Sequence, residues 1–410
     1  MANKLYEEQY IQDIADSIRS KNNKNTTYKV SEMAAAINKL KKDSKPYKDV
    51  NFIDYDGTVL YSYTASEALN LTQLPDNPTH DGLTSQGWNW TLDDIQSYVS
   101  EYGALNIGQM YITDDGSTRL YIQVRGERKT VPLCFRQSVD EGVEIDWGDG
   151  SAIQTLSGSG TTNIFPTHTY SESGDYVIKL KPSGSCTLTL GSAGPLFCVL
   201  GRISNNNKVY QNMLVKVEIG NNAVISGYFT FQSCCGLREI TIPEQITTLG
   251  GSTFSNCISL SSITIPKSVT DINGSEFNNC YELLYLMSPK NITTVGGSAF
   301  QNCYRLFDIF ALSQATSLGS YAFSNCQVIT KLVIPKEIDS ILANTFDGCS
   351  GMKTYDFSQH TQVPTLANIS AFSGIPTDCQ IIVPDSLYST WIAATNWSTY
   401  ASNIVKASEA

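Results

Sequence analysis

Residues 231–270, FQSCCGLREITIPEQITTLGGSTFSNCISLSSITIPKSVT, repeat one pattern in which a cysteine follows a phenylalanine by three residues and a leucine follows the cysteine by three. The pattern recurs every 23 residues down the chain. The cysteines are Cys234, Cys257, Cys280, Cys303, Cys326 and Cys349; the phenylalanines are Phe231, Phe254, Phe277, Phe300, Phe323 and Phe346; the third row is Leu237, Leu260, Leu283, Leu306, Ile329 and Met352. A fixed period of this length indicates stacked copies of one small unit, so the C-terminal half is predicted to be a solenoid.

Each repeat also contains a short strand pattern of leucine, two variable residues, isoleucine, one variable residue, isoleucine and proline, as in LREITIP and LSSITIP. Such strands start at Leu214, Leu237, Leu260, Leu283, Leu306, Ile329 and Met352, and CQIIVP forms a final, shifted strand. Successive side chains of a strand point to opposite faces, so the leucine and isoleucines should point inward. The third and fifth positions should then point outward.

The outward positions of the middle coils are apolar and aromatic, whereas those of the outer coils are polar. The candidate contact patch consists of Tyr285, Met287, Asp308, Phe310, Lys331 and Val333. The same coils depart from the consensus, because Ser288 and Ala311 replace the second isoleucine and Leu312 replaces the proline. Exposed patches of this kind often mark interaction surfaces. The alternative is that these coils pack against another domain or a sister subunit.

Composition limits the classes of function. The chain has 410 residues and a formal charge of −11, which argues against nucleic-acid binding because phosphate contacts need a concentrated excess of basic residues. The N-terminus carries acidic residues without the apolar run of a signal peptide, and no segment approaches a membrane span, so we expect a chain made in a cytoplasm and not inserted in a membrane. The eleven cysteines are odd in number and six belong to the repeat, which predicts buried, reduced thiols.

Five segments are predicted, and together they give a multidomain α+β and β fold. They are a helical attachment hairpin at 1–45, a small α+β module at 46–130, an immunoglobulin-like β-sandwich at 131–182, the solenoid at 183–384 and a helical cap at 385–410. Within the cap, Leu387, Trp391 and Ile392 should cover the open end. Such caps are needed because the end coils of a solenoid otherwise expose a core layer and a sheet edge.

Turn and capping residues give more detail within the module. VNFIDYDGTVLYSYT predicts two strands around an Asp56-Gly57 turn, and Thr91 with Asp94 three residues later predicts a capped helix start. The stretch QMYITDDGSTRLYIQVR, residues 109–125, predicts a β-hairpin.

In the β-sandwich segment, Trp147 and Tyr170 are the expected core anchors. The carboxylates of Asp146, Asp149 and Asp175 could hold a calcium ion, although Asp-Gly pairs serve chiefly as turn residues. WGDGS followed by HTY and SGDY resembles the PKD family of immunoglobulin-like domains. The resemblance implies a β-sandwich.

No pattern indicates catalysis or a bound metal. Cys234 and Cys235 are the only cysteines close in sequence, and His80, His168 and His360 lack ligand spacing, so zinc is not expected. A glycosidase needs two carboxylates across a cleft, and those on the outward face of the solenoid are scattered. No nucleophile elbow, phosphate-binding loop, dinucleotide-binding glycine pattern or HExxH occurs. We therefore expect no enzymatic activity, no catalytic residues, no cofactor and no metal.

Two further resemblances concern function. The segments IPEQITTLG and IPKSVTDIN, the AF/TF-xxC element and the ending IIVPDSLYSTWIAATNWSTYA resemble the BspA-like leucine-rich repeat family, which occurs on bacterial surfaces and in protists and implies adhesion rather than catalysis. The start, YEEQYIQDIADSIRSKN followed by YKVSEMAAAI, resembles tail and baseplate-associated proteins of phages that infect Gram-positive bacteria. The stretch from DVNFIDYDGTVLYSYT through GWNW to IGQMYITDDG is similar to a module of the same group.

These resemblances imply a phage tail or baseplate adhesin, a receptor-binding or tail fibre protein located in the virion, that attaches to the host surface through its solenoid. Its expected partners are a host receptor of glycan, teichoic acid or protein nature, other tail proteins bound by the N-terminal helices, and further copies of the chain, trimers being usual for tail fibres. The alternative is a bacterial cell-surface BspA-like adhesin, and the enzymatic alternative is a tail-associated glycan hydrolase.

Overall fold

The structure, a computed structural model, describes residues 48–191, 197–202, 212–225, 227–307 and 312–410. The chain divides into two units, Met1–Lys48 and Asp49–Ala410. The predicted helical hairpin at 1–45 lies outside the described residues, as do positions 308–311 of the repeat strand that starts at Leu306. Among the described helices, none combines the length and the apolar character that a membrane crossing requires.

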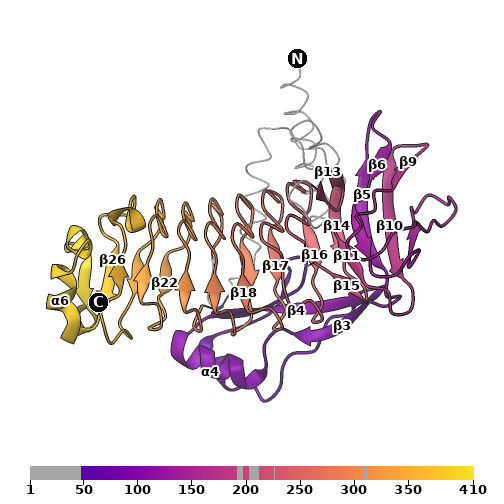
Figure 1. The fold of residues 1–410 in the computed structure, drawn as a ribbon. Coiled ribbons are helices and arrows are strands. Elements are labelled where there is room, and N and C mark those ends of the chain that lie inside the picture. Colours follow the sequence, from indigo (N-terminus) through magenta and orange to yellow (C-terminus); the bar gives the residue numbers. More distant parts are fainter. Residues whose placement is uncertain (1–47, 192–196, 203–211, 226, 308–311) are drawn as a thin grey trace, which may run out of the picture. The chain divides into compact units, whose positions relative to one another are not determined.

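The module begins with a four-stranded sheet of order β2-β1-β4-β3 (Figure 1). Its strands are β1 (Val50–Ile53), β2 (Val59–Tyr63), β3 (Leu83–Trp88) and β4 (Leu105–Thr113). β1 pairs antiparallel with β2 across the predicted Asp56-Gly57 turn and parallel with β4. The helices are α3 (Ala65–Leu69) and α4 (Leu92–Tyr102). The Asp94 N–H donates to the Thr91 hydroxyl at the start of α4, which confirms the predicted cap.

Strand β5 (Thr118–Val124) connects the β-rich region to the solenoid. It pairs antiparallel with β10 (Gly174–Pro182) on one side and with β14 (Leu214–Glu218), the first solenoid strand, on the other. The hairpin predicted over 109–125 is therefore wrong. β4 and β5 are both strands, but they enter different sheets: β4 lies between β1 and β3, and β5 lies between β10 and β14. The predicted end of the module near residue 130 stays a prediction.

The β-rich region contains four groups of strands. β8 (Val143–Asp146) extends the sheet of β5 and β10; β7 (Phe135–Gln137), β11 (Leu188–Leu190) and β15 (Ala223–Val224) form a second sheet; β6 (Thr130–Pro132) pairs with β9 (Thr167–Thr169); β12 (Phe197–Cys198) pairs with β13 (Gly201–Arg202). Trp147 and Tyr170 are buried in its core, as predicted, and the Tyr170 hydroxyl donates to the Trp147 carbonyl at 2.8 Å. The PKD resemblance stays a prediction.

The three carboxylates considered for calcium each have their own local contacts. Asp146 accepts the N–H of Gly148, Asp149 contacts the His168 ring at 2.7 Å, and Asp175 pairs with Arg125. No cluster of three or more potential ligands occurs among the described residues. Asp146 and Asp149 each accept the backbone N–H of the residue two positions later, Gly148 and Ser151, as the turn interpretation expects.

Apart from the coil that starts at Leu306, whose strand positions lie outside the described residues, each coil contributes one strand to a parallel row (Figure 1). After β14 these strands are β16 (Glu239–Thr241), β17 (Ser262–Thr264), β19 (Tyr285–Met287), β22 (Lys331–Val333), β24 (Thr354–Asp356) and β26 (Gln380–Val383). A second row consists of β18 (Asp271–Ile272), β20 (Thr294–Val295), β21 (Ser317–Leu318), β23 (Ser340–Ile341) and β25 (Thr365–Leu366). Paired residues such as Ser262 and Tyr285 are one repeat apart, so the predicted register is confirmed where the strands are described.

Two rows of side chains fill the solenoid core. The repeat phenylalanines, continued by Phe372, stack with ring centroids 5.3 to 5.7 Å apart. The repeat cysteines are buried and free, as predicted. From Cys257 to Cys349, each thiol donates to the carbonyl of the phenylalanine 26 residues earlier at 3.1 to 3.2 Å. Burial raises the pKa of Cys303 well above its ordinary value, so this thiol is a neutral core side chain.

A row of asparagines follows the phenylalanines along the solenoid. Asn256, Asn279, Asn302 and Asn325 have φ angles of 61 to 63°, a region that asparagine tolerates better than most residues. The side-chain amides of Asn279, Asn302 and Asn325 each donate to the preceding asparagine at 2.7 to 3.0 Å. This row also sets the register of the coils.

The C-terminal segment closes the last coil. It consists of η2 (Asp385–Leu387), α6 (Tyr388–Ala393), η3 (Trp397–Tyr400), β27 (Ile404–Lys406) and η4 (Ala407–Glu409). Trp391 is fully buried, and Leu387 and Ile392 pack against the core, which confirms their predicted covering role. β27 was not predicted; it pairs parallel with β26 and so covers that edge of the sheet.

One core position departs from the apolar pattern. Glu276 is fully buried, and neither carboxyl oxygen has a hydrogen-bond partner among the described residues. Ala299 and Ala322 occupy the same position in the next two coils. Burial raises the pKa of Glu276 well above its ordinary value, and only the neighbouring Thr253 hydroxyl opposes the shift. The folded chain therefore favours the protonated side chain.

Replacing Glu276 with alanine should make the stability less dependent on pH. Because the pKa of this group is raised in the folded state, its stabilising contribution is complete below the ordinary glutamate pKa and is lost as pH rises toward the folded value, by at most about 1.4 kcal/mol per pH unit. Thermal unfolding near pH 4 and pH 8 should show a larger gain for Glu276→Ala at the higher pH. The exposed Glu337→Ala is the control, and equal pH profiles for the two variants would contradict the expectation.

Candidate binding site

The module lies on the outward face of the solenoid strands. β4 contacts β16, β17 and β19, and Figure 1 shows it beside this row of strands. The outward side chains of Thr241, Ser262, Thr264 and Met287 are consequently only 0 to 3% exposed. The close approach requires glycine at position 108, since a Cβ atom there would lie 2.3 Å from the Thr264 hydroxyl oxygen and 2.8 Å from the Met287 Cβ.

The structure separates the residues of the predicted contact patch. Met287 is buried beneath β4, so its expected exposure is wrong, and the alternative of packing against another domain holds for this residue. Tyr285 and Val333 are partly buried, and Lys331 is exposed. Asp308 and Phe310 lie outside the described residues. The outward orientation followed correctly from strand alternation, but the covering module lies far away in the sequence.

Asn89 connects the two parts through three hydrogen bonds. Its side-chain amide donates to the carbonyls of Ile265 at 3.1 Å and Met287 at 2.8 Å, and its carbonyl accepts the Gly108 N–H at 2.9 Å. The side chain is 2% exposed. Removing a buried amide of this kind leaves several backbone groups without partners, at about 1–3 kcal/mol each.

The next residue explains a departure from the repeat consensus. The Trp90 indole donates to the Ser288 carbonyl at 2.9 Å, and both residues are buried. Ser288 stands where other coils carry the second isoleucine. The coil thus loses its regular inward residue at the point where the indole of the module binds its backbone.

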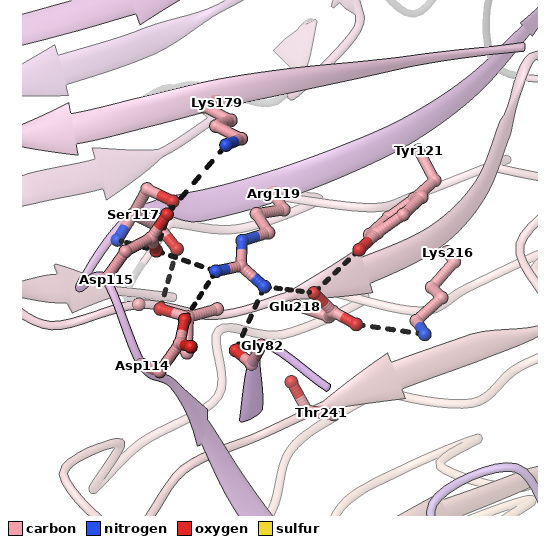
Figure 2. A network of polar contacts seen from close by, with 12 residues as sticks. Gly82, Asp114, Asp115, Ser117, Arg119, Tyr121, Lys179, Lys216, Glu218 and Thr241 are labelled. Atoms are coloured by element: carbon pink, nitrogen blue, oxygen red, sulfur yellow. Dashed lines mark hydrogen bonds and ion pairs between the residues drawn. The ribbon is translucent and has the colours of Figure 1, made fainter. Parts of the chain in front are cut away.

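A network of charged groups centred on the buried Arg119 and Glu218 joins the module, β5 and the first solenoid strand (Figure 2). Arg119 donates to the Gly82 carbonyl at 3.0 Å and pairs with Glu218 at 3.2 Å. It also pairs with Asp114 at 2.8 Å and Asp115 at 2.9 Å. The side chains of Arg119 and Glu218 are 10% and 3% exposed. Removing one partner of a buried pair costs about 3–5 kcal/mol, because the other charge remains buried.

A groove of about 500 Å³ opens where the start of α4 faces three successive coils. We call it the module–solenoid groove; it is lined by Asn89, Trp90, Thr91, Asp94, Lys267, Lys290, Asn291 and Gln314. This volume falls within the roughly 300–1,000 Å³ of small-ligand sites. Seven of its eight lining residues have polar or charged side chains, in contrast to the predicted apolar patch.

The groove contains two ammonium groups and one carboxylate. Lys290 pairs with Asp94 at 2.9 Å, and the Thr91 hydroxyl donates to the same carboxylate at 2.7 Å. Thr91 and then Lys290 hold the pKa of Asp94 below its ordinary value, so the carboxylate is ionised at neutral pH. Lys267 is exposed and forms no ion pair among the described residues. The net charge of the lining is therefore positive.

A smaller cavity of about 50 Å³ lies at the other end of α4. It includes two residues of the predicted patch, Lys331 and Val333, together with Tyr98, Tyr102, Ser313, Leu332 and Pro335. The rings of Tyr98 and Tyr102 stack with centroids 4.5 Å apart. Burial raises the pKa of Tyr102 to about 12, so its phenol is neutral. This space can hold water molecules but no sugar unit.

The repeats of the solenoid also match a known protein family. Residues 204–306 and 276–390 match the family described as BspA type leucine rich repeat region, in six copies. The solenoid of this chain is thus a leucine-rich repeat of the BspA type, as the resemblance of its repeats implied. A comparison with curated proteins found no match.

Three solved structures show similarity to this chain. A leucine-rich repeat protein of T. pallidum has 18% identity and a TM-score of 0.35, over 47% of this chain and 83% of that one. A leucine-rich repeat protein from Bacteroides ovatus has 22% identity and a TM-score of 0.37, over 50% and 52%. A leucine rich cell surface protein from Faecalibacterium prausnitzii has 23% identity and a TM-score of 0.32, over 46% and 64%. The chain spans less than two thirds of the length of the Bacteroides ovatus and Faecalibacterium prausnitzii proteins.

The groove residues were not predicted from the sequence. Lys267 and Lys290 are one repeat apart, and Gln314 lies in the following coil. The sequence could therefore have predicted a row of polar side chains on these three coils. Asn89 and Trp90 occur in the stretch GWNW, for which the sequence predicted no contact with the solenoid. No local pattern connects that stretch with the coils some two hundred residues later.

Replacing Gly108 with valine should displace the module from the solenoid, because the new side chain would overlap Thr264 and Met287. Displacement exposes the Met287 thioether, so peroxide should convert Met287 to the sulfoxide faster than in the wild-type chain, as measured by mass spectrometry. Met352, which is buried in the solenoid core, is the internal control and should remain protected. Unchanged protection of Met287 would contradict the expectation.

Proposed function

We propose that this chain is a non-enzymatic binding protein of the adhesin type, and that the module–solenoid groove is its ligand site. The observation that carries the proposal is the groove itself, which is open, polar and built jointly by α4 and three coils. A repeat surface with one covered face and one polar groove suits recognition of a surface polymer, because repeating coils present similar groups at regular spacing.

The BspA-type repeat match supports the adhesin class, since the resemblance implies adhesion rather than catalysis. Several carboxylates that could have served catalysis have structural contacts instead. Glu218 pairs with Arg119 and Lys216, and Asp356 accepts the Ser358 N–H. These contacts favour a binding role over hydrolysis.

The assignment to a phage tail or baseplate is a finer proposal. It rests on the resemblance of the N-terminal stretches alone, and so do the virion location, the contact with other tail proteins and the trimer. The bacterial cell-surface adhesin shares the same binding site and differs only in what holds the chain in place. The receptor classes are a glycan, a teichoic acid or a protein, and the polar groove favours the first two.

Filling the groove should abolish ligand binding. Gln314 is exposed and has no hydrogen bond among the described residues, so Gln314→Trp should occupy the groove at little cost to folding. We expect the wild-type chain to bind Gram-positive cells or members of an array of bacterial wall polysaccharides, and this variant to lose at least tenfold in affinity, or about 1.4 kcal/mol.

The matched control is Gln359→Trp, the same substitution at an exposed position that does not line the groove. It should bind as the wild-type chain does. Equal binding by both variants, or no binding by the wild-type chain, would contradict the proposed function. New reducing ends in the polysaccharides after incubation would contradict its non-enzymatic part.

A further inference from the structure

We propose that the module–solenoid groove binds a saccharide or polyol unit that carries one negative charge, with its carboxylate or phosphate directed to Lys267. This inference rests on the proposed function and names the chemistry of the ligand. It is drawn from three properties of the lining: its charges, its unused hydrogen-bonding groups and the position of its aromatic ring.

The charges favour a single anionic group. Lys290 is already neutralised by Asp94, at 2.9 Å, whereas Lys267 has no ion-pair partner among the described residues. A neutral ligand would leave this ammonium group without a counterpart. A bound unit with several negative charges would be repelled by Asp94 and by the neighbouring Asp93, which is exposed.

One acidic residue near Lys267 lies outside the groove lining. Glu244 interacts electrostatically with Lys267, but burial is the larger effect and raises the pKa of Glu244 above its ordinary value. Its neutral form is thereby favoured, and one of its carboxyl oxygens is buried without a hydrogen-bond partner. Glu244 is therefore a weaker counterpart for Lys267 than a bound carboxylate or phosphate in the open groove.

The unused hydrogen-bonding groups indicate hydroxyls on the ligand. Asn89 makes three hydrogen bonds of its own, and the Thr91 hydroxyl is occupied by Asp94. The Asn291 side chain donates to the Lys267 carbonyl, which leaves its oxygen as an acceptor. The Gln314 amide has no partner among the described residues and can both donate and accept. A hydroxyl group matches both kinds of contact.

The aromatic residue of the groove provides little stacking surface. Trp90 is 3% exposed, its indole N–H is donated to Ser288, and its ring packs edge-on to Tyr98 with centroids 5.2 Å apart. A neutral sugar that depends on stacking its apolar face on an aromatic ring would find no such platform. Charge and hydrogen bonds must then account for most of the affinity.

Three probes test the inference by calorimetry: oligogalacturonate for the carboxylate, poly(glycerol phosphate) for the phosphate, and dextran as the neutral polymer. We expect one of the two acidic probes to bind, with an affinity that falls as salt is added, and dextran not to bind. Lys267→Gln should weaken binding of the acidic probe about tenfold, the effect of losing one hydrogen bond to a charged group.

Lys336→Gln is the matched control, because Lys336 is exposed at the equivalent position three coils later and does not line the groove. It should bind like the wild-type chain. Equal effects of the two lysine variants, dextran binding as tight as that of the acidic probes, or no binding of either acidic probe would overturn the inference. If Gln314→Trp still abolishes binding to cells or wall polysaccharides, the proposed function stands; if it does not, both fail.

Discussion

The antiparallel pairing of β5 with β14 is the contact on which the rest of this structure depends. A parallel solenoid cannot end in an open strand edge without exposing unpaired backbone groups, and β5 covers that edge at the first coil. The same strand pairs with β10, so one sheet continues from the β-rich region into the solenoid. Because β4 immediately precedes β5, closing this edge also directs the module onto the outward face of the coils.

The buried charges around Arg119 strengthen this arrangement in a specific way. Four groups from three parts of the chain converge on one guanidinium, and Arg119 with Glu218 is nearly inaccessible to solvent (Figure 2). Desolvation offsets much of the attraction in such pairs, so their contribution to net stability is small. Another register of β5 on β14 would separate Arg119 from Glu218, the pair that joins the two strands, and breaking a buried pair is costly. The network therefore selects one alignment of module and solenoid rather than simply adding stability.

How far the sequence predicts the structure depends on how local the determining contacts are. The 23-residue period predicted the coils, their inward cysteines and phenylalanines and most strand positions, because each coil contacts mainly its neighbours. The helix cap at Thr91 and the turn at Asp56-Gly57 were also predicted, because residues close in sequence determine them. The partners of β4 and β5 were not predicted, since alternation identifies a strand without identifying its neighbour. Met287 faces outward as predicted, yet a strand far away in the sequence covers it.

The groove could not be predicted from the sequence, because its two walls come from parts of the chain that lie far apart. A recognition site within the repeats alone would appear as a periodic change at one position of each coil. Here one wall comes from residues 89–94 and the other from coils between 267 and 314, so neither wall is complete in the sequence. The sequence contains only an indirect sign of the groove: Ser288 replaces the consensus isoleucine in the coil whose backbone accepts the Trp90 indole N–H. A departure from the repeat consensus can therefore mark where another part of the chain packs. The binding groove then lies beside that position rather than on it.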